Sequence, residues 1–174
     1  MAKTTLRRDA SRTRANVRSG VATAQLSGGA RRSPALERLN VFIGRWITEG
    51  ETVAGADASS VRIAASDVYQ WLPGAHFIMH PAYGRIGEAD VGGLEVIGYD
   101  GETGQYRTYF FDSEGATTTQ TLTCQGDTWT WQDAHAKCTG VFTDGGKTLI
   151  ARHERSDDGK HWTPSMTVTL RKVD

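Results

Sequence analysis

Hydrophobic and polar residues alternate in short runs from about residue 45 to the end of the chain, and turn-forming residues separate the runs. Alternation with a period of two is typical of a half-buried β-strand. The connections are short and rich in Gly, Asp and Pro, which favours antiparallel neighbours. The pattern predicts ten strands, at residues 45–53, 60–72, 75–83, 93–99, 105–112, 116–124, 128–132, 137–143, 147–155 and 162–172. The longest connection, residues 84–92, is expected to be a mobile loop.

Ten short antiparallel strands close most naturally into an up-and-down β-barrel, because closure leaves no unpaired strand edge. A short helix is expected before the first strand. Ser33 can cap it, Pro34 suits its first position, and Leu36 and Leu39 would form its apolar face. Gly44 ends the helix, which we expect to plug one end of the barrel.

The chain of 174 residues has no net charge, but its charges are unevenly distributed. Residues 1–40 hold nine Lys and Arg against two acidic residues, a charge of +7, and the remaining residues hold eleven against eighteen, a charge of −7. Residues 1–33 contain no aromatic ring and are expected to be a disordered basic extension. The domain is therefore predicted at residues 34–174. A targeting segment, docking on the acidic body and contact with a polyanion stay open as roles for the extension.

Several partners and locations are disfavoured by what the sequence lacks. No apolar run follows the Arg7-Arg8 pair, so an export signal is not supported. The basic extension has no rings to stack on bases, so no nucleic acid is predicted as a partner. No apolar stretch reaches 18 residues, and no membrane partner is predicted. Cys124 and Cys138 have neither zinc nor redox spacing and are expected to be reduced thiols, as in a cytoplasmic protein.

The hairpin around Pro73-Gly74 is the segment where register can be predicted. A two-residue turn there would pair Tyr69 with Ile78 and Asp67 with His80. Two faces follow from the alternation, and the sequence does not decide which one lines the interior. One carries Asp67, Tyr69, Trp71, His76, Ile78 and His80, and the other carries Val68, Gln70, Leu72, Ala75, Phe77 and Met79.

Rings occur on both faces of the strand at residues 105–112. Tyr109 and Phe111 share one face, whereas Tyr106 and Phe110 share the other. Strands with rings on both faces are usually covered on the outside as well, so a homodimer is expected.

The candidate chemistry is sparse. The chain has no Gly-x-Ser-x-Gly turn, no phosphate-binding glycine loop and no dinucleotide fingerprint. His76 and His80 would lie about 13 Å apart along a strand, too far to share a metal ion. Asp67 and His80 could form an oriented general base, or simply an exposed cross-strand ion pair. We predict neither a metal nor a cofactor.

The Gly44-x-Trp46 motif after a short helix, the antiparallel meander and the terminal Arg171 resemble the lipocalin and calycin superfamily. The resemblance implies that Trp46 closes the barrel floor and that Arg171 packs over its ring as a cation–π pair. Residues 36–173 look more closely like a bacterial lipocalin-like family of unknown function. That likeness rests on residues 39–46, the Trp71-Leu72-Pro73-Gly74 hairpin, Ile97-Gly98-Tyr99-Asp100 and the Tyr106 strand.

A more distant resemblance is to the nitrobindins, ten-stranded barrels that bind haem through one His near the C-terminus. His153 and His161 are the corresponding candidates here. The last strand, with Ser165-Met166-Thr167-Val168, contains no His and departs from that pattern.

These observations predict an all-β, lipocalin-like barrel that binds a small hydrophobic or aromatic molecule in its interior. The alternatives are a small isomerase, cyclase or hydrolase using a His/Asp pair, a haem protein, and an interaction module with a filled interior. The predicted ligand-binding residues are Trp46, Tyr69, Trp71, His76, His80, Tyr109, Phe111, Trp129, Trp131 and His153.

Overall fold

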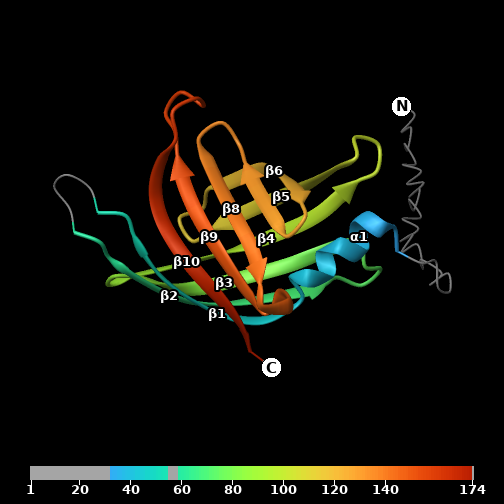
Figure 1. Ribbon diagram of the computed structural model, residues 1–174, viewed down its shortest axis with the longest axis horizontal. Coiled ribbons are helices and arrows are strands. Elements are labelled where there is room, and N and C mark those ends of the chain that lie inside the picture. The colour runs from blue at the N-terminus through green and yellow to red at the C-terminus, as the bar shows by residue number, and fades with distance from the viewer. Residues whose placement is uncertain (1–31, 55–58, 174) are drawn as a thin grey trace, which may run out of the picture.

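The computed structural model describes residues 32–54 and 59–173. Its ten strands form a closed antiparallel barrel in which each strand pairs with its neighbours in sequence and β1 pairs with β10 (Figure 1). The predicted fold class is confirmed. The basic extension before residue 32 lies outside the described residues. The strands are β1 (Gly44–Thr52), β2 (Arg62–Trp71), β3 (Phe77–Ile86), β4 (Ala89–Asp100), β5 (Gln105–Asp112), β6 (Thr117–Gln125), β7 (Thr128–Gln132), β8 (Ala136–Thr143), β9 (Thr148–Arg155) and β10 (Thr163–Val173).

The predicted loop at residues 84–92 is wrong. β3 and β4 continue through this segment and are joined by a tight turn at Gly87, whose φ of 62° is left-handed. Gly84 and Gly92 weaken the alternation in the sequence, but the structure needs them for close packing. A Cβ on Gly84 would lie 2.4 Å from the Cβ of Ala65 on β2.

A short helix lies at one end of the barrel, as predicted (Figure 1). Helix α1 (Pro34–Arg38) is capped by Ser33, whose Oγ accepts a hydrogen bond from the Leu36 N–H at 3.3 Å. A 3₁₀ turn, η1 (Leu39–Val41), continues it. Leu36, Leu39 and Phe42 are buried, so this segment closes the barrel at what we call the helix side.

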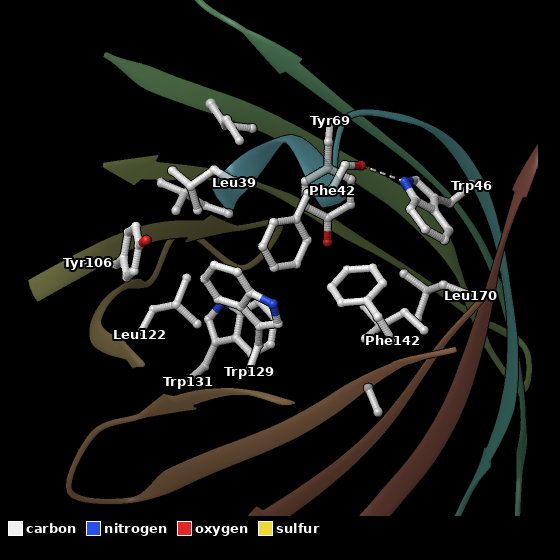
Figure 2. Packing of buried hydrophobic residues seen from close by; sticks show 14 of the residues in the cluster. Leu39, Phe42, Trp46, Tyr69, Tyr106, Leu122, Trp129, Trp131, Phe142 and Leu170 are labelled. Carbon is white, nitrogen blue, oxygen red and sulfur yellow. Dashed lines mark hydrogen bonds between the residues drawn. The ribbon is translucent and has the colours of Figure 1, made fainter. Parts of the chain in front are cut away.

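The helix-side half of the interior is filled by aromatic rings. Figure 2 shows Phe42 among rings from β2, β7 and β8. Its ring centroid lies 4.9 Å from that of Trp129 and 5.1 Å from that of Phe142, both in edge-on contact, and 5.5 Å from that of Tyr69. Such pairs stabilise a core beyond the burial of their area. This half of the interior is a packed core.

The hairpin between β2 and β3 differs from the predicted two-residue turn. Trp71 is opposite Ile78, and the Leu72 N–H donates to the Phe77 carbonyl, so the loop has four residues, 73–76. Ala75 adopts a left-handed φ of 54° in this loop. The shift is by two residues, which preserves the faces. The buried face is therefore the one that contains Asp67, Tyr69, Ile78 and His80.

Trp46 is buried at the barrel floor, but its cationic partner is not the predicted Arg171. Trp46 is opposite Lys172 on β10, and the Lys172 Nζ lies 4.7 Å from the centre of the indole ring. Arg171 is one residue away, so it points outward and lies 3.7 Å from Glu49. The Trp46 Nε1 donates a 2.8 Å hydrogen bond to the Phe42 carbonyl, which ties β1 to the plug.

Within residues 32–54 and 59–173, no helix is both long enough and apolar enough to span a membrane. Cys124 and Cys138 are free thiols.

Candidate functional site

A buried polar cluster lies in the middle of the barrel. His80 on β3 contacts Glu95 on β4 through Nδ1 at 2.9 Å and Asp67 on β2 through Nε2 at 3.0 Å. The exposed fractions of the three residues are 9%, 7% and 6%. Their strands are adjacent and all three side chains point inward, so the barrel register brings them together.

The remaining carboxyl oxygens of the cluster are also paired. The Thr48 hydroxyl on β1 donates to Asp67 Oδ2, and the Trp131 Nε1 on β7 donates to Glu95 Oε1 at 3.0 Å. The Tyr69 ring stacks on the imidazole with centroids 3.6 Å apart. The cluster therefore connects five strands and leaves none of its four carboxyl oxygens without a partner.

The charge state of His80 follows from these contacts. Burial by itself would lower the pKa of His80, but the hydrogen bonds to Asp67 and Glu95 and their charges outweigh it and raise that pKa. Burial, with the nearby charges of Glu95 and Asp67, raises the pKa of Tyr69. The raised pKa favours the imidazolium form of His80, which donates from both ring nitrogens to the two carboxylates. His80 has no free nitrogen with which to take a proton from a substrate.

A second group of side chains lies further from the helix. Cys138 on β8 is opposite His153 on β9, and its Sγ lies 3.6 Å from His153 Nε2. Burial raises the pKa of Cys138 to about 12, and burial together with Arg155 lowers the pKa of His153 to about 4. Met166 on β10 is opposite His153 and packs against the core. A neutral thiol, a neutral imidazole and a thioether thus form one row across three strands.

Several inward-facing residues in the half of the barrel away from α1, which we call the mouth half, are only partly buried, although Ile63 on β2 is buried there. The strand register turns Phe110, Gln120, Cys138, His153 and Met166 toward the interior, yet each retains partial solvent exposure. Thr118, opposite Phe110, is inward-facing and exposed. Solvent therefore reaches these inner side chains, unlike the packed rings on the helix side.

The structure separates the predicted binding residues into four groups. Trp46, Tyr69, His80, Trp129 and Trp131 are buried inside the barrel, and His153 faces the mouth half. Trp71 lies at the helix side, where its Nε1 donates to Asn40 Oδ1 at 2.9 Å.

His76, Tyr109 and Phe111 lie outside the barrel, where a ligand in the interior would not touch them. His76 belongs to the four-residue loop, and Tyr109 and Phe111 have the outward parity of β5, with exposed fractions of 41% and 47%. His161 is also outside, with its Nδ1 2.6 Å from Asp158.

Two shallow pockets lie on the outer face of the described chain. One, of about 410 Å³, spans β3, β4 and β5 and includes Tyr83, Leu94 and Phe111. The other, of about 280 Å³, spans β6 and β7 and is lined mainly by Thr and Gln.

Sequence reasoning found the contact between Asp67 and His80 but missed Glu95. The signal was present, because Glu95 interrupts the apolar run from Leu94 to Ile97. A charge at an inward position of a strand needs a buried partner.

The family model described as "Protein of unknown function (DUF1579)" matches residues 33–172, so the chain belongs to this family. A search of the curated proteins finds no match. The lipocalin and calycin assignment stays a resemblance.

Solved structures share the barrel at low sequence identity. The crystal structure of Rv2717c from M. tuberculosis aligns with a TM-score of 0.60 and 11% identity, covering 83% of this chain and 100% of that one. The S-type phycobiliprotein lyase CPES from Guillardia theta gives a TM-score of 0.50 and 10% identity, covering 82% and 94%. A de novo designed fluorescence-activating β-barrel aligns with a TM-score of 0.42 and 16% identity, covering 77% of this chain and 95% of that one. The first two similarities support the fold and nothing beyond it.

Proposed function

We propose that this member of the DUF1579 family binds a small hydrophobic or aromatic molecule in the mouth half of its barrel. The observation that carries the proposal is the difference between the two halves. Rings fill the helix side, whereas several inward-facing residues of the mouth half are still reached by solvent. The floor of the site would be the Asp67, His80 and Glu95 cluster with Tyr69 stacked on it.

The residues that face the mouth half suit such a ligand. Phe110 and Met166 offer apolar contact, and burial of apolar surface contributes about 2.5 kcal/mol per 100 Å². Gln120 and His153 offer polar groups that would fix orientation. Ala82 and Gly93 are small inward-facing residues on β3 and β4, and the Phe110 ring packs directly against Gly93, where an added Cβ would lie 2.5 Å from it. The contacts would therefore lie nearer the mouth than Trp129, which packs within the core.

An enzyme that uses Asp67 and His80 as a general base is the alternative from the sequence. The geometry favours binding over catalysis, because both ring nitrogens of His80 are hydrogen-bonded to carboxylates and neither is free to act as a base. Haem ligation through His153 is the other alternative, and addition of haem tests it. If the wild type shows a Soret band shifted from that of free haem and His153→Gln lacks this band, haem ligation would replace the binding proposal.

Two further predictions concern assembly and location. The outer face of β3 and β5 exposes Phe77, Tyr83, Tyr109 and Phe111, and a homodimer through this face stays a prediction that sedimentation analysis tests. A bacterial source and a cytoplasmic location also stay predictions.

The binding proposal is tested with Nile red, a neutral dye that fluoresces in apolar surroundings, and a matched pair of variants. Thr118 and Thr119 are adjacent and exposed on β6, but Thr118 faces the interior and Thr119 faces outward. Thr118→Trp narrows the mouth, whereas Thr119→Trp adds the same ring outside. We expect the wild type to bind the dye saturably, one to one. The affinity should be at least about tenfold weaker in Thr118→Trp, because the added ring in the mouth reduces the ligand surface that can be buried. Thr119→Trp should bind the dye as the wild type does.

A third variant separates the interior from the outer pocket. Phe111→Ala removes a ring from the pocket over β3, β4 and β5 and leaves the interior intact. Binding that is lost in Phe111→Ala and kept in Thr118→Trp would place the dye outside and overturn the proposal. A wild type that shows no saturable binding would overturn it as well.

A further inference from the structure

Three soft donor side chains lie in register on the inner face of the barrel. Cys138 on β8 pairs with His153 on β9, and His153 pairs with Met166 on β10. Side chains directly opposite each other on one face of a sheet have Cβ atoms about 4.5–5.5 Å apart. All three are partly buried, and Cys138 and Met166 both pack against the hydrophobic core. The barrel thus gathers a thiol, an imidazole and a thioether from positions distant in the sequence.

We propose that Cys138, His153 and Met166 bind a soft monovalent metal ion, Cu(I), in the mouth half of the barrel. Thiolate and thioether sulfurs select Cu(I) over harder ions, and imidazole suits copper as well. The described residues contain no group of three His, Cys, Asp or Glu side chains placed to hold a metal. In the site proposed here, the Met166 thioether would supply the third donor, because Met166 is opposite His153. This donor set is too small and too soft for a structural zinc site, which takes four nitrogen or sulfur ligands.

The distance between the first two donors of the row fits a shared ion. The Cys138 Sγ lies 3.6 Å from His153 Nε2. Metal bonds of about 2.3 Å to sulfur and 2.0 Å to nitrogen, the lengths known for zinc, span about 3.6 Å when they meet at about 115°. The same distance also fits a weak S–H···N hydrogen bond, which is the alternative that the experiment must separate.

The binding step is balanced without any redox partner. Cu(I) replaces the thiol proton of Cys138, which passes to solvent, while the neutral His153 and Met166 donate lone pairs. No electron is transferred. The thiolate and the monovalent ion together carry no net charge, so the product suits a partly buried position. This proposal stands apart from the proposed function, because it requires no organic ligand.

The test uses the full-length, reduced protein under anaerobic conditions, titrated with Cu(I) against the chromophoric chelator bicinchoninate. We expect the wild type to withdraw one equivalent of Cu(I) from the chelator. Cys138→Ser and His153→Gln should each weaken binding at least tenfold, since loss of even a supporting group costs about 10–100-fold in metal affinity. Met166→Leu keeps the volume of the side chain and should also weaken it.

Cys124→Ser is the matched control. Cys124 is the other free cysteine and is also partly buried, but it lies near the helix, where Arg38 Nη1 is 3.8 Å from its sulfur. We expect this variant to bind Cu(I) as the wild type does. X-ray absorption of the loaded wild type should show two sulfur neighbours and one nitrogen neighbour, a readout that does not depend on how any variant folds.

Three outcomes would overturn the proposal. The first is that the wild type fails to withdraw Cu(I) from bicinchoninate. The second is that Cys124→Ser loses Cu(I) binding while Cys138→Ser keeps it. The third is that the X-ray absorption spectrum shows no second sulfur neighbour. The last two would assign the copper to another site or to a different ligand set. The first would leave the contact between Cys138 and His153 as a hydrogen bond.

Discussion

Replacement of His80 by Gln should destabilise the barrel strongly, and the loss should depend on pH in a defined way. The imidazolium lies between Asp67 and Glu95 at 3.0 and 2.9 Å, and all three side chains are about one-tenth exposed. The neutral amide cannot compensate two carboxylates, which then face each other in the interior. Breaking a buried ion pair by removing one partner costs about 3–5 kcal/mol. We expect a decrease of this size in the free energy of unfolding near pH 6.5.

The pH dependence follows from the raised pKa of His80. A folded-state pKa above the unfolded value of about 6.5 contributes stability that is complete below pH 6.5 and is lost as the pH rises through the folded pKa. The wild type should therefore lose stability as the pH rises above 6.5, and the variant should not. The difference in unfolding free energy between the two proteins should therefore decrease as the pH rises above 6.5.

Urea denaturation followed by tryptophan fluorescence measures this difference at pH 5.5, 6.5 and 8.5. His76→Gln is the control, because His76 lies in the exposed loop between β2 and β3 and should leave stability unchanged. A loss below about 1 kcal/mol at pH 6.5, the value typical of an exposed pair, would refute the description of a buried ionic cluster. If the difference in unfolding free energy between wild type and His80→Gln stays constant up to pH 8.5, the assignment of a charged His80 would be refuted.

Two further substitutions test the packing of the barrel. Gly50→Ala should lower the urea midpoint, because a Cβ there would lie 2.1 Å from the Thr167 carbonyl oxygen, whereas Gly101→Ala has no heavy atom within 4 Å and should be neutral. An unchanged midpoint for Gly50→Ala would contradict the close approach of β1 and β10. Lys172→Met should reduce the free energy of unfolding by about 1 kcal/mol through loss of its cation–π contact, while Arg171→Met, which points outward, should change it little. Equal effects would contradict the assigned orientation of these neighbours.

The strands and the barrel could be predicted from the sequence, because alternation and turn residues are local signals. The ten predicted segments match β1–β10 except where β3 and β4 extend into residues 84–92. Glycines in that segment suggested a loop, although Gly84 serves close contact between strands. A glycine required for a turn and one required for packing have the same identity in a sequence. Only the neighbouring strand distinguishes them.

The candidate sites were harder to predict, because they depend on register across several strands. Pairing of Cys138 with His153 is set by the turn between β8 and β9, where Asp144, Gly145 and Gly146 all adopt left-handed φ values. A turn of different length would place other residues opposite each other. The contact between Asp67 and His80 was predicted in spite of a register wrong by two residues. A shift by an even number retains the face, so the two side chains still meet.

Closure of the barrel joins the first strand to the last, and this has a consequence for how the chain folds. β1 pairs with β10 from Arg45 opposite Val173 to Thr52 opposite Met166. The contacts of β1 with β10 therefore cannot form until the final residues of the domain are present. Contacts this distant in sequence make folding slow, in the range of milliseconds to seconds. During synthesis, β1 leaves the ribosome long before β10 exists, with one side of its backbone unpaired. An unpaired edge of this kind favours aggregation for as long as β10 has not yet paired with it.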